Sequence, residues 1–391
     1  MLRILLLIML SVLSISPLQA GAPIVIALNV DLSSKDAEAG EAIRRGALVA
    51  IRELNRAGGV LGRPLMLEIH DHRRNPARGV ENVRQIAKNA QVIAILGGKH
   101  TPVIHAQLEL IHSYGIPYLI PWAAGTHLVE HHRRPNFVFR VSIRDEFAGQ
   151  FLIDHALAQG YKRLALVLEQ TSWGRSNELS LTLALRDHGL APAWVEWFNW
   201  GEQRFKHTLQ RIQQADVDAV IFVGNAPDAA NFMLALQDQP PPQRLPVISH
   251  WGLIGGEFEQ RLAAQLGELD LCFVQTFSFF NPPFPARAEQ FLEGYRALFP
   301  QTRSIADIYA PSAVAHSYDL VHLLASAITQ AGVVERSAVQ QALEKLAPHE
   351  GLVRDYHPPF APERHDALDI SDLQMGRFSR EGGIIPLSVK E

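Results

Sequence analysis

The chain has 391 residues, a length that favours two domains over one small core. Hydrophobic residues make up 47% of it and charged residues 19%, which is typical of a folded globular protein and not of a disordered one. The net charge of -4 leaves no basic surplus for a nucleic-acid backbone, so we expect no nucleic-acid partner.

The N-terminal segment has the pattern of a secretory signal peptide. Arg3 places a positive charge ahead of the apolar run Ile4–Ile15, and small residues follow at a cleavage point after about Ala20. The apolar run is too short to span a membrane, and no cysteine follows it to carry a lipid anchor. The pattern predicts export to the periplasm. The one cysteine, Cys272, excludes an internal disulfide.

Short apolar runs and amphipathic stretches then alternate along the chain. In the first amphipathic stretch Ile43, Ala47 and Ile51 recur at helical spacing. The apolar runs are rich in Val, Ile, Leu and Phe without strict alternation, as strands buried on both faces are. They are Ile24–Val30, Leu65–His70, Val92–Leu96, Ile116–Ile120, Leu164–Leu168, Val195–Asn199, Ala219–Val223, Pro246–Ser249 and Leu271–Phe277. This order predicts an α/β protein whose parallel sheets are covered by helices.

The connection from Leu54 to Pro76 is dense in turn-forming residues. Gly58-Gly59 is expected to end the first helix, because glycine adopts the left-handed conformation at least cost. Asn75-Pro76 is expected to start the next helix, since proline suits a first helical position. The basic pair Arg73-Arg74 between them is expected to be a solvated loop charge. The connection therefore predicts one unit of a repeating α/β domain.

Two segments share the order strand, glycine, polar turn, proline and helix. They are Val92–Pro102 and Ala219–Asp228. In an open parallel sheet such a turn lies at the carboxyl end of its strand, where helix N-termini bind ligands. Thr101 followed by Pro102 is expected to be the N-cap and the first residue of its helix. Two such domains facing each other would enclose a ligand cleft.

Histidine pairs are the remaining candidates for a metal site. His70 and His72 stand two apart at a strand end, and His131 and His132 are adjacent. A chain with 17 histidines forms such pairs readily by chance, and no third ligand stands at a recognisable spacing. We therefore expect neither a metal nor any other cofactor.

The chain resembles the periplasmic branched-chain amino acid binding proteins, which are type I solute-binding proteins of ABC importers. The residues that carry the resemblance are AIRELNRAGGVLGRPLMLEIHD (Ala50–Asp71), NPARGVENVRQI (Asn75–Ile86), VIAILGG followed by GIPYLIPWAAG, and DVDAVIFVGNAPDAANFMLAL. The resemblance runs from about Pro23 to the C-terminus and implies the periplasmic binding protein type I fold. In that fold two Rossmann-like lobes are joined by three crossover segments and close like a hinge. Such proteins are not enzymes.

The resemblance also implies where the two lobes begin and end. The first lobe is expected to hold residues 23–142 plus 276–351, and the second residues 143–275 plus 352–391. In some family members a cysteine pair links the two positions that Arg74 and His100 take here. That link is absent from this chain.

The family's pocket carries over to the first lobe in part. Thr101 stands where the family places a hydroxyl residue that binds the ligand carboxylate. Its helix N-terminus would add free amides and a positive dipole end. Trp122, Ala123 and Ala124, in PWAAG, match the second segment of the pocket. Ala124 replaces a frequent threonine, so one side-chain hydrogen bond is lost.

The second lobe departs further from the family's pattern. Trp173 replaces a tyrosine and keeps an aromatic wall, and Asn225 stands where an aromatic residue is common. Trp251 stands where amino-acid binders carry an acidic residue that pairs with the α-ammonium group. Without that carboxylate a desolvated ammonium would lack its counter-charge, which is costly. Asp145, just past the first crossover, is the candidate substitute.

These residues predict a ligand with an anionic or hydrogen-bond-accepting end and an apolar or aromatic body, not a standard α-amino acid. The expected partners are this small molecule and ABC permease subunits in the inner membrane, and we expect a monomer. Three alternatives stay open. They are a binder of branched-chain or other amino acids, a sensor that feeds a membrane receptor or kinase, and an exported enzyme using Asp145, Glu169 or the His-rich loops.

Overall fold

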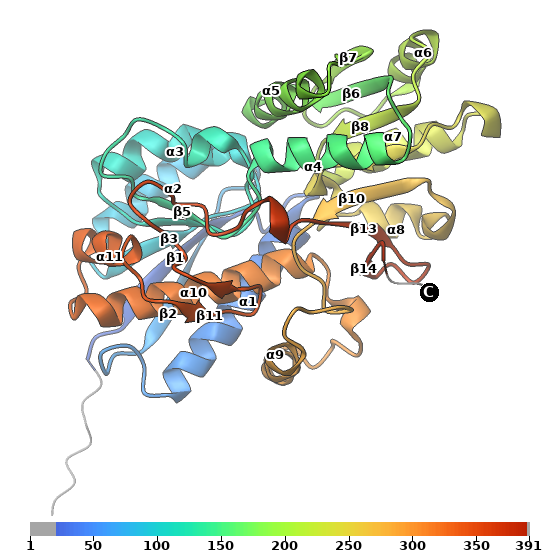
Figure 1. Ribbon diagram of the computed structural model, residues 1–391. Helices are drawn as coiled ribbons and strands as arrows, with labels where there is room; N and C mark the ends of the chain where they lie inside the picture. Colours follow the sequence, from blue (N-terminus) through green and yellow to red (C-terminus); the bar gives the residue numbers. More distant parts are fainter. Residues whose placement is uncertain (1–20, 389–391) are drawn as a thin grey trace, which may run out of the picture.

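The computed structural model describes residues 21–388 (Figure 1). The predicted signal peptide, Met1–Ala20, lies outside the described residues. Among the residues that are described, no helix combines the length and apolar character needed to cross a membrane. Two sheets, each flanked by helices, form two lobes that lie side by side (Figure 1).

The first lobe is built on a five-stranded parallel sheet in the order β2-β1-β3-β4-β5. Its strands are β1 (Ile24–Val30), β2 (Leu65–Asp71), β3 (Val92–Leu96), β4 (Tyr118–Ile120) and β5 (Val138–Arg140), and its first helices are α1 (Ala37–Arg56), α2 (Pro76–Lys88) and α3 (Thr101–Ser113). Alternate residues of β1 enter two separate cores: Ile26 packs with Ile43 of α1, and Ala27 with Val83 of α2. Helices on both faces explain why this strand is apolar throughout.

The second lobe is built on a seven-stranded mixed sheet in the order β14-β13-β10-β9-β8-β6-β7. Its strands are β6 (Leu164–Glu169), β7 (Trp194–Phe198), β8 (Ala219–Val223), β9 (Val247–Ser249), β10 (Leu271–Gln275), β13 (Gln374–Phe378) and β14 (Ile384–Pro386), and its helices are α4 (Asp145–Ala158), α5 (Ser172–Asp187), α6 (Lys206–Gln214), α7 (Ala226–Gln237) and α8 (Phe258–Leu262). β13 and β14 are antiparallel additions, whereas the other strands are parallel.

The chain passes between the lobes three times. It leaves β5 for α4, and it returns after β10 to form α9 (Pro285–Leu298), α10 (Pro311–Ala331) and α11 (Arg336–Leu343), of which α9 and α10 pack on α1. A small hairpin of β11 (His349–Glu350) and β12 (Asp355–Tyr356) precedes the last passage to β13. Two α/β lobes joined by three crossover segments are the architecture that the sequence predicted.

The last passage first follows the edge of the first sheet. The Arg140 amide donates to the carbonyl of His365 at 2.8 Å, and the Ala367 amide donates to the carbonyl of Arg140 at 2.9 Å. The Phe360 ring lies 5.1 Å from that of Phe139. Residues 352–368 therefore pack against the first lobe before the chain reaches the second sheet.

The turn-rich connection after α1 has the predicted conformation. Gly58 and Gly59 have φ values of +104° and +77°, and a Cβ on Gly59 would lie 2.2 Å from the carbonyl oxygen of Arg63. Asn75 caps α2 by accepting a hydrogen bond from the Arg78 amide at 3.1 Å. One prediction about helix ends was wrong. His100, not Thr101, is the N-cap of α3, so Thr101 is the first helical residue and Pro102 the second.

Candidate functional site

A small, narrow cavity lies between the lobes, where the carboxyl ends of the central strands of both sheets meet. Its walls come from the turns after β3, β4, β8 and β9 and from the first turn of α5. The lining residues are Lys99, His100, Thr101, Pro102, Trp122, Ala124, Trp173, Asn225, Trp251 and Gly252.

Most of the predicted binding residues lie in this one cavity. Those that line it are Thr101, Trp122, Ala124, Trp173, Asn225 and Trp251. Ala123 and Asp145 are not among its lining residues. Ala123 points into the core of the first lobe, where it packs with Ile120 and Leu128. Asp145 is fully buried behind the ring of Trp173.

Two tryptophans close the cavity from opposite lobes. The ring centres of Trp122 and Trp251 are 5.0 Å apart, with the planes inclined by 33°. Both side chains are only 1% exposed, so the two rings shield each other from solvent. The contact explains the small volume of the cavity. A ligand that enters between the lobes has to separate these rings or lie beside them.

Asp145 orients an aromatic wall. One carboxylate oxygen accepts hydrogen bonds from Trp173 Nε1 at 3.2 Å and from His250 Nε2 at 3.1 Å. The Trp251 amide donates to His250 Nδ1 at 2.9 Å, so the proton of His250 is on Nε2 and points at Asp145. The other oxygen of Asp145 is buried without a partner. The carboxylate thus connects the first turn of α4 with Trp173 and His250, away from the cavity.

The polar end of the cavity is at the N-terminus of α3. Thr101 Oγ1 accepts a hydrogen bond from the Gly125 amide at 3.3 Å. Lys99 Nζ donates to Asp36 Oδ1 and to the carbonyl of Ile254, both at 2.9 Å. His100 Nε2 lies 3.3 Å from Asp36 Oδ2, whereas His100 Nδ1 is buried with no hydrogen-bond partner. An unpaired imidazole nitrogen, a lysine and a helix N-terminus can together bind a polar or anionic group.

A buried charge network beside the cavity links the lobes. Arg74 Nη2 donates to Asp228 Oδ2 of the second lobe at 3.2 Å, and its Nε lies 3.6 Å from Asp36 Oδ2 of the first lobe. Its guanidinium also stacks over the ring of Trp200 at 4.4 Å. The side chain is only 16% exposed, so the prediction of a solvated loop charge at Arg74 was wrong. Asp228 and Trp200 of the second lobe cover it.

The carboxylates of this network have altered acidities. Burial raises the pKa of Glu169 to about 7, with Asp228 acting in the same direction and Arg74 against it. Burial likewise raises the pKa of Asp228 to about 6. Burial also works to raise the pKa of Asp36, but Lys99, His100 and Arg74 outweigh it and hold that pKa below its usual range. Asn225, on the cavity wall, donates to Glu169 Oε2 at 2.7 Å and joins the network to the cavity.

Replacing Glu169 by Gln is expected to raise stability above neutral pH. Because the pKa of Glu169 rises from 4.5 to about 7 on folding, its contribution is complete below pH 4.5 and is lost as the pH rises through 7. Glutamine keeps a neutral side chain at every pH. Urea unfolding at pH 5, 6, 7 and 8 should show the variant gaining about 3 kcal/mol on wild type across this range. The partly exposed Glu178→Gln is the control, and a pH-independent difference for Glu169→Gln would contradict the expectation.

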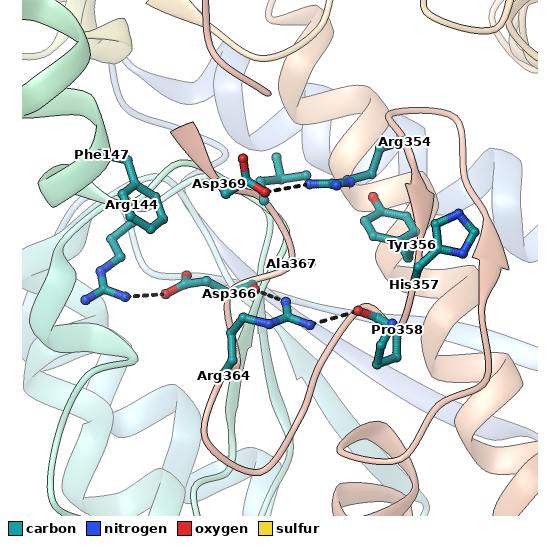
Figure 2. Close-up of a pocket in the computed structure, with 11 residues that line it drawn as sticks. Arg144, Phe147, Arg354, Tyr356, His357, Pro358, Arg364, Asp366, Ala367 and Asp369 are labelled. Atoms are coloured by element: carbon teal, nitrogen blue, oxygen red, sulfur yellow. Dashed lines mark hydrogen bonds and ion pairs between the residues drawn. The ribbon is translucent and has the colours of Figure 1, made fainter. Parts of the chain in front are cut away.

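A second, wider pocket lies where the first and last passages between the lobes meet (Figure 2). Phe147 of α4 forms one side of it, and the segment after β12 forms the other. Its three arginines already have partners. Arg144 lies 3.8 Å from Asp366 and Arg354 lies 3.2 Å from Asp369. Arg364 donates to main-chain carbonyls, including that of Pro358 at 2.9 Å. None of the predicted binding residues lines this pocket, so the interlobe cavity remains the candidate site.

Comparison with known proteins identifies the family. The family model described as periplasmic binding protein matches residues 23–366. The chain belongs to the periplasmic binding protein family. Leu/Ile/Val-binding protein homolog 1 of Brucella abortus (strain 2308) is 24% identical over 342 residues, which are 86% of each chain. Together these matches support a type I periplasmic binding protein of the branched-chain amino acid family, as predicted.

Solved structures share the fold at low sequence identity. A periplasmic binding protein type 1 from Bordetella pertussis Tohama I has a TM-score of 0.83 at 23% identity, covering 94% of this chain and 100% of that one. The LivJ protein of Streptococcus pneumoniae, in complex with isoleucine, has a TM-score of 0.78 at 21% identity and covers 93% and 99%. A solute-binding protein from R. palustris, in complex with benzoate, has a TM-score of 0.77 at 17% identity and covers 93% and 95%.

Family membership bears on two of the predictions made from the sequence, those on catalysis and on location. Proteins of this family are substrate-binding components of ABC transporters and not enzymes, so the predicted lack of catalysis is confirmed. The family also implies a periplasmic or other extracytoplasmic location. The charge network of Asp36, Arg74, Asp228 and Glu169 was not predicted. Its only sequence signal is position, because Asp36, Arg74 and Asp228 follow β1, β2 and β8, and Glu169 is the last residue of β6, at the carboxyl edge of the two sheets.

Proposed function

We propose that this protein captures a small organic ligand in the interlobe cavity and delivers it to the permease of an ABC importer in the inner membrane. The ligand has an anionic or polar end and an apolar or aromatic body. The N-terminus of α3, with Lys99 and His100, suits the polar end. The rings of Trp122, Trp173 and Trp251 suit the body, because aromatic walls favour planar and apolar groups.

The observation that carries the proposal is the absence of an acidic side chain from the cavity lining. Among the described residues that line the cavity there is a lysine and a histidine but no Asp or Glu. Asp145, the candidate partner for an ammonium group, faces Trp173 and His250 instead. Burying an ammonium group without a counter-charge costs several kcal/mol. A carboxylate without an α-amino group avoids that cost.

Calorimetry and tryptophan fluorescence can test this ligand class directly. Benzoate and octanoate are the probes that carry a carboxylate and an apolar body without an ammonium group. Leucine and isoleucine carry the same kind of apolar body with the ammonium group, and benzamide removes only the negative charge. We expect saturable binding of at least one of the carboxylates, at least 100-fold weaker binding of leucine, and loss of binding for benzamide. Tight binding of leucine would refute the proposed ligand class.

A branched-chain amino acid is the second candidate ligand. It is favoured by the Leu/Ile/Val-binding names of the relatives and by the isoleucine complex of the S. pneumoniae protein. In this case the unpartnered oxygen of Asp145 would have to meet the ammonium group after a rotation of Trp173. The same titration decides between the two candidate ligand classes. Benzoate binds more tightly than leucine if the ligand is a carboxylate without an ammonium group, and leucine binds more tightly if it is an amino acid.

Delivery to a permease requires export and a moving hinge. We propose cleavage after about Ala20, which the mass of the exported protein tests, and a monomer, which its sedimentation tests. The proposed lobes are residues 23–142 plus 276–351 and residues 143–275 plus 352–391. The packing of residues 352–368 along β5 suggests moving the last boundary to about Asp369. Ligand binding then shifts the hinge equilibrium toward the closed form that a permease recognises.

A further inference from the structure

Two histidines of the first lobe, remote in sequence, face each other on its surface. His112 is in the last turn of α3, and His131 follows the short helix η1 (Thr126–Leu128). Their ring centres are 4.8 Å apart and the planes are nearly perpendicular, at 80°. His112 Nε2 and both ring nitrogens of His131 are buried without a hydrogen-bond partner. Both side chains are half-buried, so the pair lies close to solvent.

The hydrogen bonds around His112 leave its Nε2 free to coordinate. His112 Nδ1 is 2.8 Å from the carbonyl oxygen of Leu108, which only accepts, so Nδ1 carries the proton. Nε2 is therefore the atom with the free lone pair. Asn136 lies beside the ring and interacts with it, and its amide also donates to the Val129 carbonyl and accepts from the Val138 amide. Metal-binding histidines commonly have this arrangement, with the second nitrogen donating to a carbonyl.

The separation of the rings fits a shared metal ion. Two imidazoles that bind one ion at about 2.0–2.1 Å, with an angle between tetrahedral and square, have ring centres about 4.5 to 5.2 Å apart. The observed 4.8 Å lies within this range. The nearby segment from Glu130 to Pro135 is mostly exposed, so small adjustments of His131 meet little resistance.

We propose that His112 and His131 form a binding site for a divalent transition-metal ion such as Zn²⁺, Ni²⁺ or Cu²⁺. His112 Nε2 and one ring nitrogen of His131 are the protein ligands, and water completes the coordination. Among the described residues no group of three or more His, Cys, Asp or Glu side chains is placed to hold a metal, so the site has two protein ligands. Imidazole ligands disfavour Mg²⁺ and Ca²⁺, which prefer oxygen ligands. A bound ion would cross-link α3 to the segment after η1.

The test uses the full mature chain without an affinity tag, after treatment with EDTA. Calorimetry with ZnCl₂ should show one equivalent bound, and MgCl₂ should show none. With one equivalent of CuCl₂, electron paramagnetic resonance should show coupling to two imidazole nitrogens. His112→Gln and His131→Gln should each weaken binding at least tenfold. His132→Gln and His105→Gln are the matched controls and should leave binding unchanged, although His105 lies in a similar pair with His127, with ring centres 4.7 Å apart.

Several results would overturn the proposal. These are the lack of saturable Zn²⁺ and Cu²⁺ binding by the wild-type chain, binding that survives both His112→Gln and His131→Gln, and binding that His105→Gln abolishes. The melting temperature of each variant in EDTA shows whether it folds. The Cu²⁺ spectrum of the wild-type chain needs no variant, so the proposal remains testable if one of them fails to fold.

Discussion

Replacing Arg74 by Ala is expected to open the protein in solution and to weaken ligand binding. The guanidinium joins Asp36 of the first lobe to Asp228 of the second, and all three groups are largely or fully buried. Without it, two buried carboxylates lose their shared cation, and removing one partner of a buried pair typically costs about 3–5 kcal/mol. Because this contact exists only when the lobes meet, the cost falls on the closed form. A cost of about 3 kcal/mol shifts the hinge equilibrium about 100-fold toward the open form.

Small-angle scattering and calorimetry can measure this effect. The radius of gyration of Arg74→Ala should exceed that of wild type, and the affinity for the ligand found in the screen should fall. Arg84→Ala is the matched control, because Arg84 pairs with Glu81 at 3.3 Å on the exposed face of α2. Exposed pairs contribute about 0–1 kcal/mol, so the control should behave as wild type. Equal scattering curves and equal affinities for wild type and Arg74→Ala would show that Arg74 does not hold the lobes together.

Local sequence patterns predicted the continuous apolar strands well and missed strands that are short or interrupted by polar residues. β1, β3 and β8 have the predicted bounds, because continuous apolar runs are buried between helices on both faces. β5 was missed because it has only three residues and ends in Arg140. That arginine can be buried because Asp366, distant in sequence, pairs with it at 2.5 Å and the carbonyls of Ala123 and Gly125 accept hydrogen bonds from it. β13, with the sequence QMGRF, was missed because a glycine and polar residues interrupt its apolar pattern; it lies between β10 and β14 in the antiparallel part of the sheet.

The sequence predicted which residues line the candidate site but not how the charged residues beside it are paired. Family resemblance and the rule for carboxyl ends of strands located Thr101 and the three tryptophans. The role of Asp145 depends on where the α4 N-terminus places it relative to Trp173 and His250, a tertiary relation that no local pattern contains. No local pattern distinguishes Arg74 from a solvated loop arginine, because its burial depends on contacts with the second lobe. Residues whose environment comes from the other lobe are therefore the ones that sequence patterns missed.

Replacing Trp251 by Asp is expected to exchange the ligand preference of the cavity. Trp251 is 1% exposed and forms one wall against Trp122, and it stands where the family resemblance places the acidic partner of an α-ammonium group. Its removal takes away an aromatic wall, and the new carboxylate repels an anionic ligand in a desolvated site. We expect benzoate binding to fall at least 100-fold and leucine binding to become measurable. This expectation rests on the proposed ligand class.

Trp251→Asn is the matched variant, because it removes the same ring and introduces a side chain of similar shape without the charge. Calorimetry with benzoate and leucine on both variants separates the two effects of the substitution. A loss of benzoate binding in both variants measures the contribution of the indole ring. A gain of leucine binding in the Asp variant alone measures the contribution of the negative charge. Trp194→Ala, on the edge strand β7, controls for loss of a tryptophan elsewhere. If the Asp variant bound leucine no better than the Asn variant, the missing carboxylate at this position would not be what excludes amino acids. The selectivity would then have to come from the first-lobe end of the cavity, at Lys99 and Thr101.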